Sequence, residues 1–163
     1  MSTKLPTRPA KILLSSTPRF AIVASEYNPD FVQALVNNAC KELYAIEENC
    51  VIELFGVPGS FEIPVVAEMI AAQRRHDVIL ALGVILQGKT KHADLIAASV
   101  SDGLQQVALK HAVPVIHEVL LVATEEDARE RCSGELNRGI EAARAAFAML
   151  RVREEVQKKK APR

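Results

Sequence analysis

The residues best suited to chemistry stand close together, at positions 88 to 92 of the 163-residue chain. Gly88, Lys89 and Thr90 combine a glycine, an ammonium group and a hydroxyl, and they precede a helix-like pattern that begins at His92. The first N–H groups of a helix have no partner inside the helix and carry partial positive charge, so they attract anions. This stretch therefore predicts a binding site for an anion such as phosphate.

His92 adds a side chain that can move protons. An unperturbed imidazole changes its charge near neutral pH, which suits it to general acid–base catalysis. A histidine with no chemical role can equally occupy the first turn of a helix. The residue type alone leaves both interpretations open.

The segment 83–90 also matches the nucleotide-binding pattern G-x-x-x-x-G-K-[ST]. A P-loop wraps its backbone N–H groups around phosphates, and small residues suit that path. Here Val84, Ile85 and Leu86 are large and apolar, and the one later strand does not end in an aspartate that could hold magnesium. A P-loop nucleotide-binding protein is therefore the less favoured alternative, and a seat for a single phosphate is favoured.

Strand-like and helix-like segments alternate along the chain and must position these residues. Apolar runs predict strands at 20–24, 51–55, 77–84 and 113–122, and helical spacing predicts helices at 31–45, 62–75, 92–111, 128–132 and 140–152. Strands that are apolar on both faces are typical of a buried parallel sheet. The alternation predicts an α/β sandwich of three layers around a four-stranded parallel sheet. Polar motifs follow the first three strands, at the carboxyl ends where such sheets bind ligands.

The composition favours an ordinary soluble domain. Lys and Arg together number 20, as do Asp and Glu, so the net charge gives no indication of nucleic-acid or membrane binding. The three cysteines have no metal-binding spacing, which favours a reducing cytoplasm and indicates neither a metal site nor disulfides. We expect residues 1–18 to form a loosely held arm, 19–152 the functional domain, and 153–163 a charged, solvated tail.

Four motifs, in this order and spacing, resemble the lumazine synthase family. They are Tyr27-Asn28, the segment 57–64, the segment 83–92, and Ala128 followed by Arg131. The resemblance runs from about residue 20 to about residue 149 and implies a flavodoxin-like fold. It also implies a transferase of riboflavin biosynthesis that condenses 5-amino-6-(D-ribitylamino)uracil with 3,4-dihydroxy-2-butanone 4-phosphate. The product, in the penultimate step of that pathway, is 6,7-dimethyl-8-ribityllumazine, and neither a metal nor an organic cofactor takes part.

The resemblance also implies roles for individual residues. His92 is the catalytic proton carrier. The ribitylaminouracil is bound by Tyr27, Ser60, Phe61, Glu62, Val84, Ile85, Leu86 and His117. The butanone phosphate is bound by Lys89, Thr90 and Arg131. Simpler interpretations stand beside these: Glu62 suits the N-terminus of any helix, and Arg131 suits a solvated helix face.

Some positions depart from the family pattern. His117 stands where the family has Phe against the pyrimidine, Glu118 and Leu121 replace a Gly and a Thr, and Arg138 takes the place of a Lys. These changes motivate a third alternative, a non-catalytic shell protein that binds flavin or lumazine. The family forms pentamers with sites between neighbouring subunits, so His117 and Arg131 would come from the neighbour. Some members assemble a 60-subunit capsid, in some cases around riboflavin synthase.

Overall fold

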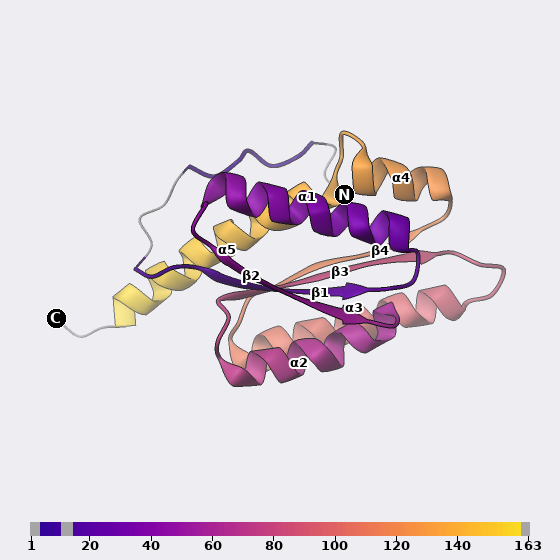
Figure 1. Cartoon of the computed structure of the whole chain (residues 1–163). Helices are drawn as coiled ribbons and strands as arrows, with labels where there is room; N and C mark the ends of the chain where they lie inside the picture. Colours follow the sequence, from indigo (N-terminus) through magenta and orange to yellow (C-terminus); the bar gives the residue numbers. More distant parts are fainter. Residues whose placement is uncertain (1–3, 11–14, 161–163) are drawn as a thin grey trace.

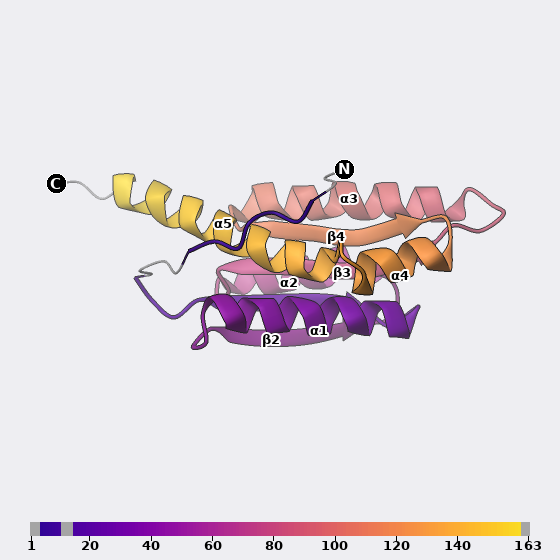
Figure 2. The same ribbon diagram turned by 90° about the horizontal axis from the view of Figure 1, so that it is seen from above.

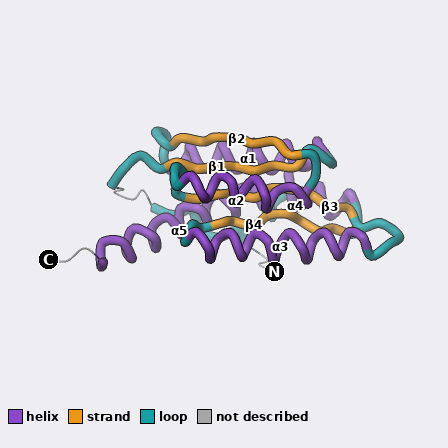
Figure 3. Tube along the Cα trace, turned by 90° about the horizontal axis from the view of Figure 1, so that it is seen from below, coloured by secondary structure: helices purple, strands orange, loops and turns teal. Residues whose placement is uncertain are grey.

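The computed structural model describes residues 4–10 and 15–160 of the chain. Its elements, in chain order, are β1 (Arg19–Ser25), α1 (Pro29–Ile46), β2 (Val51–Val57), the 3-10 helix η1 (Ser60–Glu62), α2 (Ile63–Gln73), β3 (Val78–Leu86), α3 (His92–His111), β4 (Val115–Val122), α4 (Glu125–Ser133) and α5 (Arg138–Lys160). All four strands are parallel, in the order β2-β1-β3-β4 (Figure 3). Helices α1, α4 and α5 cover one face of the sheet, and α2 and α3 cover the other (Figure 1). The predicted α/β sandwich with a four-stranded parallel sheet is confirmed.

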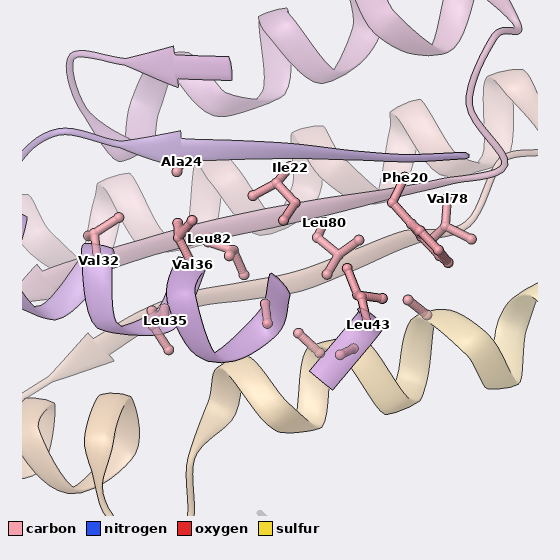
Figure 4. Close-up of a cluster of buried hydrophobic side chains, with 14 of the residues drawn as sticks. Phe20, Ile22, Ala24, Val32, Leu35, Val36, Leu43, Val78, Leu80 and Leu82 are labelled. Atoms are coloured by element: carbon pink, nitrogen blue, oxygen red, sulfur yellow. The ribbon is translucent and has the colours of Figure 1, made fainter. Parts of the chain in front are cut away.

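The core lies on both faces of the sheet because successive strand side chains point in opposite directions. Figure 4 shows the face toward α1 and α5, where the packed side chains include Phe20, Ile22, Leu35, Leu43, Leu80 and Leu82. Ala21, Val23 and Ile79 belong to the second cluster, beneath α2 and α3. Burial on both faces explains why the central strands β1 and β3 are continuous apolar runs in the sequence. Each fully buried large aliphatic side chain contributes roughly 1.5–3 kcal/mol.

The end of α5 differs from the sequence prediction. The helix was expected to end at residue 152 and to give way to a solvated tail, but it continues to Lys160. Arg153 donates hydrogen bonds to the backbone oxygen and Oδ1 of Asp77, both at 3.0 Å. Glu154 is buried and accepts hydrogen bonds from both N and Oγ of Ser15. These contacts give the charged segment partners that local sequence does not reveal.

The described part of the N-terminal arm is also held more closely than expected. Arg8 donates two hydrogen bonds to the carboxylate of Glu42 in α1, at 2.8 and 2.6 Å, and Arg144 of α5 donates to the same carboxylate and to the Pro6 carbonyl. Figure 2 shows the arm running along α5. Residues 1–3, 11–14 and 161–163 of the predicted arm and tail lie outside the described residues.

Candidate active site

A cleft of about 890 Å³ lies at the carboxyl ends of β1, β2 and β3, where the strand arrows point in Figure 1. Its lining residues are Tyr27, Asn28, Pro58, Gly59, Ser60, Phe61, Glu62, Val84, Ile85, Leu86, Gly88, Thr90, His92, Ala93 and Ile96. Pockets for small molecules typically measure about 300–1,000 Å³ and combine apolar walls with a few polar groups. The cleft therefore has the size and lining of a small-molecule site, at the edge expected for this class of fold.

The loop after β1 is fastened to both neighbouring strands. The N–H of Glu26 donates to the Val57 carbonyl at 2.8 Å, and the Asn28 side-chain amide donates to the Val84 carbonyl at 2.8 Å. Asn28 has φ 57° and ψ 55°, a left-handed conformation that Asn tolerates better than most residues. These bonds hold Tyr27 at the mouth of the cleft, with 69% of its surface exposed.

The turn after β2 brings Glu62 and Tyr27 together over Gly59. Oε2 of Glu62 accepts a hydrogen bond from the Gly59 N–H at 2.9 Å. A Cβ added at Gly59 would lie 3.0 Å from the Tyr27 ring and 3.0 Å from that same oxygen, so no larger side chain fits without a shift. Glu62 thus stabilises the start of a helix, as the simpler interpretation expects, and also lines the cleft.

Strand β3 determines how the segment 83–90 is folded. The strand continues through Leu86, and the N–H of Gln87 still bonds the Val122 carbonyl at 2.8 Å. Val84, Ile85 and Leu86 are therefore extended and form a wall of the cleft, so they cannot curl around a pyrophosphate. The geometry disagrees with the P-loop alternative.

The loop beyond Gln87 turns into α3 next to the cleft. Thr90 Oγ1 lies 3.4 Å from the N–H of His92, the first residue of the helix. Gly88, Thr90 and His92 all line the cleft, and their side chains or backbone are exposed to it. The structure thus brings together a helix N-terminus, a hydroxyl and an imidazole. An anion and an exchangeable proton can both be handled at this corner.

Three of the predicted site residues do not line this cleft. Lys89 is exposed in the loop that carries Gly88 and Thr90. His117 lies on the edge strand β4, paired in register with Ala81, and Arg131 lies on α4 just after that strand. The predicted site is therefore divided between the cleft and the β4 side of the molecule.

Glu118 marks the β4 side as an unusual electrostatic environment. Burial, and to a lesser extent the nearby Glu141 carboxylate, raises the pKa of its carboxyl to about 7. The positive charges of Arg138 and Arg131 oppose that shift. Two arginines and two carboxyl groups thus meet where β4, α4 and α5 come together.

Several lining residues were not assigned a role from the sequence. They are Asn28, Pro58, Gly59, Ala93 and Ile96. Most belong to the recognised motifs, so their place in the chain already indicated the cleft. Ile96 lies one helical turn after His92, a spacing that puts both side chains on one face of α3.

Residues 4–10 and 15–160 contain neither a candidate metal site nor a helix suited to crossing a membrane. Within these ranges no three His, Cys, Asp or Glu side chains come close enough to hold a metal ion. None of the described helices combines the length and apolarity that a bilayer crossing requires.

Comparison with known proteins identifies the family. The profile of the family described as 6,7-dimethyl-8-ribityllumazine synthase matches residues 17–154. The chain belongs to this family. A synthase of that name from Thermococcus onnurineus is 41% identical over 79% of this chain and 84% of the relative. Synthases from Chlorobium phaeobacteroides (40% identical, 81% and 86%) and Leuconostoc mesenteroides (34%, 91% and 96%) are similar over comparable spans. Membership of the lumazine synthase family rules against the P-loop alternative. The flavodoxin-like sandwich expected for this family is the fold observed.

Proposed function

We propose that the protein condenses 5-amino-6-(D-ribitylamino)uracil with 3,4-dihydroxy-2-butanone 4-phosphate to form 6,7-dimethyl-8-ribityllumazine. The observation that carries the proposal is the convergence of three family motifs on one cleft. Tyr27, the segment 58–62 and the segment 84–92 follow three different strands, yet all line the same space. The convergence of these motifs in space supports the proposal independently of the percentage identity to the relatives.

The pyrimidine side of the cleft is formed by β1, β2 and β3. The exposed Tyr27 ring offers a face on which a flat heterocycle can stack, an interaction worth about 0.5–1.5 kcal/mol beyond burial. The backbone of Val84, Ile85 and Leu86 supplies hydrogen-bonding groups to the ring. Ser60, Phe61 and Glu62 border the space left for the ribityl chain.

The phosphate side is the start of α3. The backbone N–H groups of Gly88 and its neighbours and the Thr90 hydroxyl would hold the phosphate, with Lys89 adding positive charge. His92 lines the same cleft as this seat and the wall of β3, so we expect it to reach both substrates.

The chemistry needs proton transfers and alignment. The pyrimidine amine attacks the ketone carbonyl, water leaves, and an imine forms. Loss of phosphate and closure of the second ring, with loss of a second water, then give the lumazine. His92 accepts and returns protons in these steps, and holding two substrates in register supplies much of the acceleration. Every bond change occurs between the two substrates, so the proposal uses no cofactor.

We further propose that a neighbouring copy completes the site with His117 and Arg131. Two separate apolar surfaces support a head-to-tail contact between copies. Phe61, Val65 and Met69 are each more than half exposed beside the cleft, and their spacing puts Val65 and Met69 on one face of α2. A groove of about 550 Å³ along α3, β4 and α5 forms the second surface, whose exposed apolar residues include Leu109 and Val156. A closed ring of this kind is the pentamer that the resemblance implies, whereas a capsid and a riboflavin synthase partner rest on the resemblance alone.

The decisive experiment mixes the protein with both substrates and follows lumazine formation by its absorbance. We expect acceleration over the uncatalysed condensation, and a large loss of that acceleration in His92→Gln. Absence of acceleration by the unchanged protein would rule out the proposed activity. Tight lumazine binding without acceleration would instead identify the non-catalytic binding protein considered above.

A further inference from the structure

The His117 ring uses both of its nitrogens within the chain. Nδ1 lies 3.2 Å from the backbone N–H of Val119, two residues along β4. Nε2 lies 2.8 Å from the Ser101 hydroxyl of α3, and that hydroxyl also lies 2.8 Å from the Ala97 carbonyl one helical turn earlier. The side chain of an edge strand is thus tied to the helix that begins at the cleft.

These contacts determine where the protons lie. A backbone N–H can only donate, so Nδ1 of His117 must accept the bond from Val119 and carries no proton. The Ser101 hydroxyl has a single proton, which it gives to the Ala97 carbonyl, so it must accept the proton on Nε2 of His117. Two independent contacts therefore select the same state, the neutral ring with its proton on Nε2.

We propose that Ser101 is a positioning residue that holds His117 as a neutral, oriented ring for the pyrimidine substrate of the adjoining subunit. This inference rests on the proposed function and adds to it a residue of α3 that does not touch the substrate. Protonation of His117 would require a proton on Nδ1, which would break the bond from Val119. The pair Ser101–His117 thus reproduces with an imidazole the uncharged flat surface that a phenylalanine would give.

The surroundings of the ring agree with an uncharged state. Partial burial of the ring lowers the pKa of His117, and a contact with the residue's own backbone opposes part of that shift. Its register partner on β3 is Ala81, which carries no charge, and α3 presents the hydroxyl of Ser101. Glu118 follows His117 in an extended strand, so its side chain points to the opposite face of the sheet. Across the described ranges His117 forms no ion pair with a carboxylate.

The first experiment measures the tautomeric state of the His117 ring. The chain has four histidines, so ¹⁵N-labelled histidine gives a small set of ring signals, which single His→Gln variants assign. We expect His117 to show the pure Nε2–H tautomer in the unliganded protein. Ser101→Ala should give shifts averaged between tautomers, and Ser101→Thr should restore the single tautomer. Ser99→Ala is the matched control, since Ser99 is an exposed serine of the same helix. Unchanged His117 signals in Ser101→Ala would overturn the proposal that Ser101 fixes the tautomer of His117.

The second experiment measures how the Ser101–His117 contact affects KM and kcat of the proposed reaction. Ser101→Ala should raise KM for the ribitylaminouracil roughly three- to tenfold, the range of one oriented aromatic contact, with little change in kcat. The variant removes a hydroxyl that bonds back within the helix and introduces the best helix former, so we expect it to fold. Ser101→Thr should retain the original KM.

A double-mutant cycle separates positioning from a general structural effect. In the His117→Phe background the ring has no proton to fix, so adding Ser101→Ala should change KM less than twofold. The same increase in KM in both backgrounds would overturn the positioning role, as would an unchanged KM in Ser101→Ala alone. Failure of the proposed function would give a different result, because the unchanged protein would then not form lumazine. The histidine signals would still show whether Ser101 fixes the tautomer of His117.

Discussion

Beneath the cleft, Gly83 is packed against two hydroxyl groups. A Cβ at this position would lie 2.8 Å from Oγ of Ser60, 3.0 Å from Oγ of Ser25 and 3.3 Å from Val119. Ser60 lines the cleft and Ser25 is buried, so neither can move aside freely. The close approach of β3 to the turn after β2 therefore explains why the family motif begins with a glycine, Gly83.

This contact predicts the effect of Gly83→Ala. We expect a loss of about 1–3 kcal/mol in the free energy of unfolding, from overpacking, together with a raised KM for the pyrimidine because Ser60 is displaced. Denaturant titration and steady-state kinetics measure the two effects. Gly88→Ala is the matched control for stability, since a Cβ there would meet no heavy atom within 4 Å. Equal losses of stability in both variants would argue against the packing explanation.

Glu118 predicts a specific dependence of stability on pH. Its carboxyl has a folded-state pKa of about 7 against an ordinary 4.5, chiefly because it is buried. Between these values the folded protein keeps a proton that the unfolded chain has lost, so this residue's contribution to stability falls as the pH rises through that window. Glu118→Gln removes the titration and should be more stable than the unchanged protein at pH 8, by on the order of 2 kcal/mol. Melting temperatures of both proteins from pH 4.5 to 8 test this, and parallel curves would contradict it.

Among the elements, the strands and most helices could be predicted because their signals are local. The apolar run of β3 and the spacing of α3 are readable in short windows, and the sequence placed α3 at residues 92–111, as observed. The last turns of α5 could not be predicted, because Asp77 and Ser15 stabilise Arg153 and Glu154 from distant parts of the chain. The same limit applies to the site: local motifs indicate the cleft, whereas the bond between Ser101 and His117 joins two elements and leaves no local pattern.

Helix α4 matters because it carries Arg131. Thr124 begins this helix by accepting a hydrogen bond from the N–H of Asp127 at 3.1 Å. Loss of such a cap costs about 1 kcal/mol and frays the first turn. Thr124→Ala should therefore raise KM for the butanone phosphate more than KM for the pyrimidine, since fraying of the first turn loosens the short helix that carries Arg131 in its last turn. Thr124→Ser keeps the oxygen and should behave as the unchanged protein; equal changes in both KM values would contradict this role of α4.

For the whole molecule, the position of β4 at the edge of the sheet has the largest consequence. Its neighbour β3 ends at the cleft, but the residues of β4 and α4 that the family pattern assigns to the site do not line that cleft. A chain that supplies one half of a site at the end of its strands and another half along its edge is suited to a closed ring. In the ring proposed above, each copy would give its cleft to one neighbour and its β4 side to the other.

This arrangement predicts that two inactive variants restore each other. Alone, His92→Gln would remove the proposed proton carrier from every site, and Arg131→Ala would remove the proposed phosphate contact from every site. When the two variants are co-expressed in equal amounts and assemble at random, about a quarter of the sites receive His92 from one chain and Arg131 from its neighbour. Activity should therefore rise to roughly a quarter of that of the unchanged protein, measured per assembled subunit and compared with a mixture of the separately purified variants before exchange. If both residues served a site within one chain, every site would lack one of them, and co-expression would give no more activity than the average of the two variants alone.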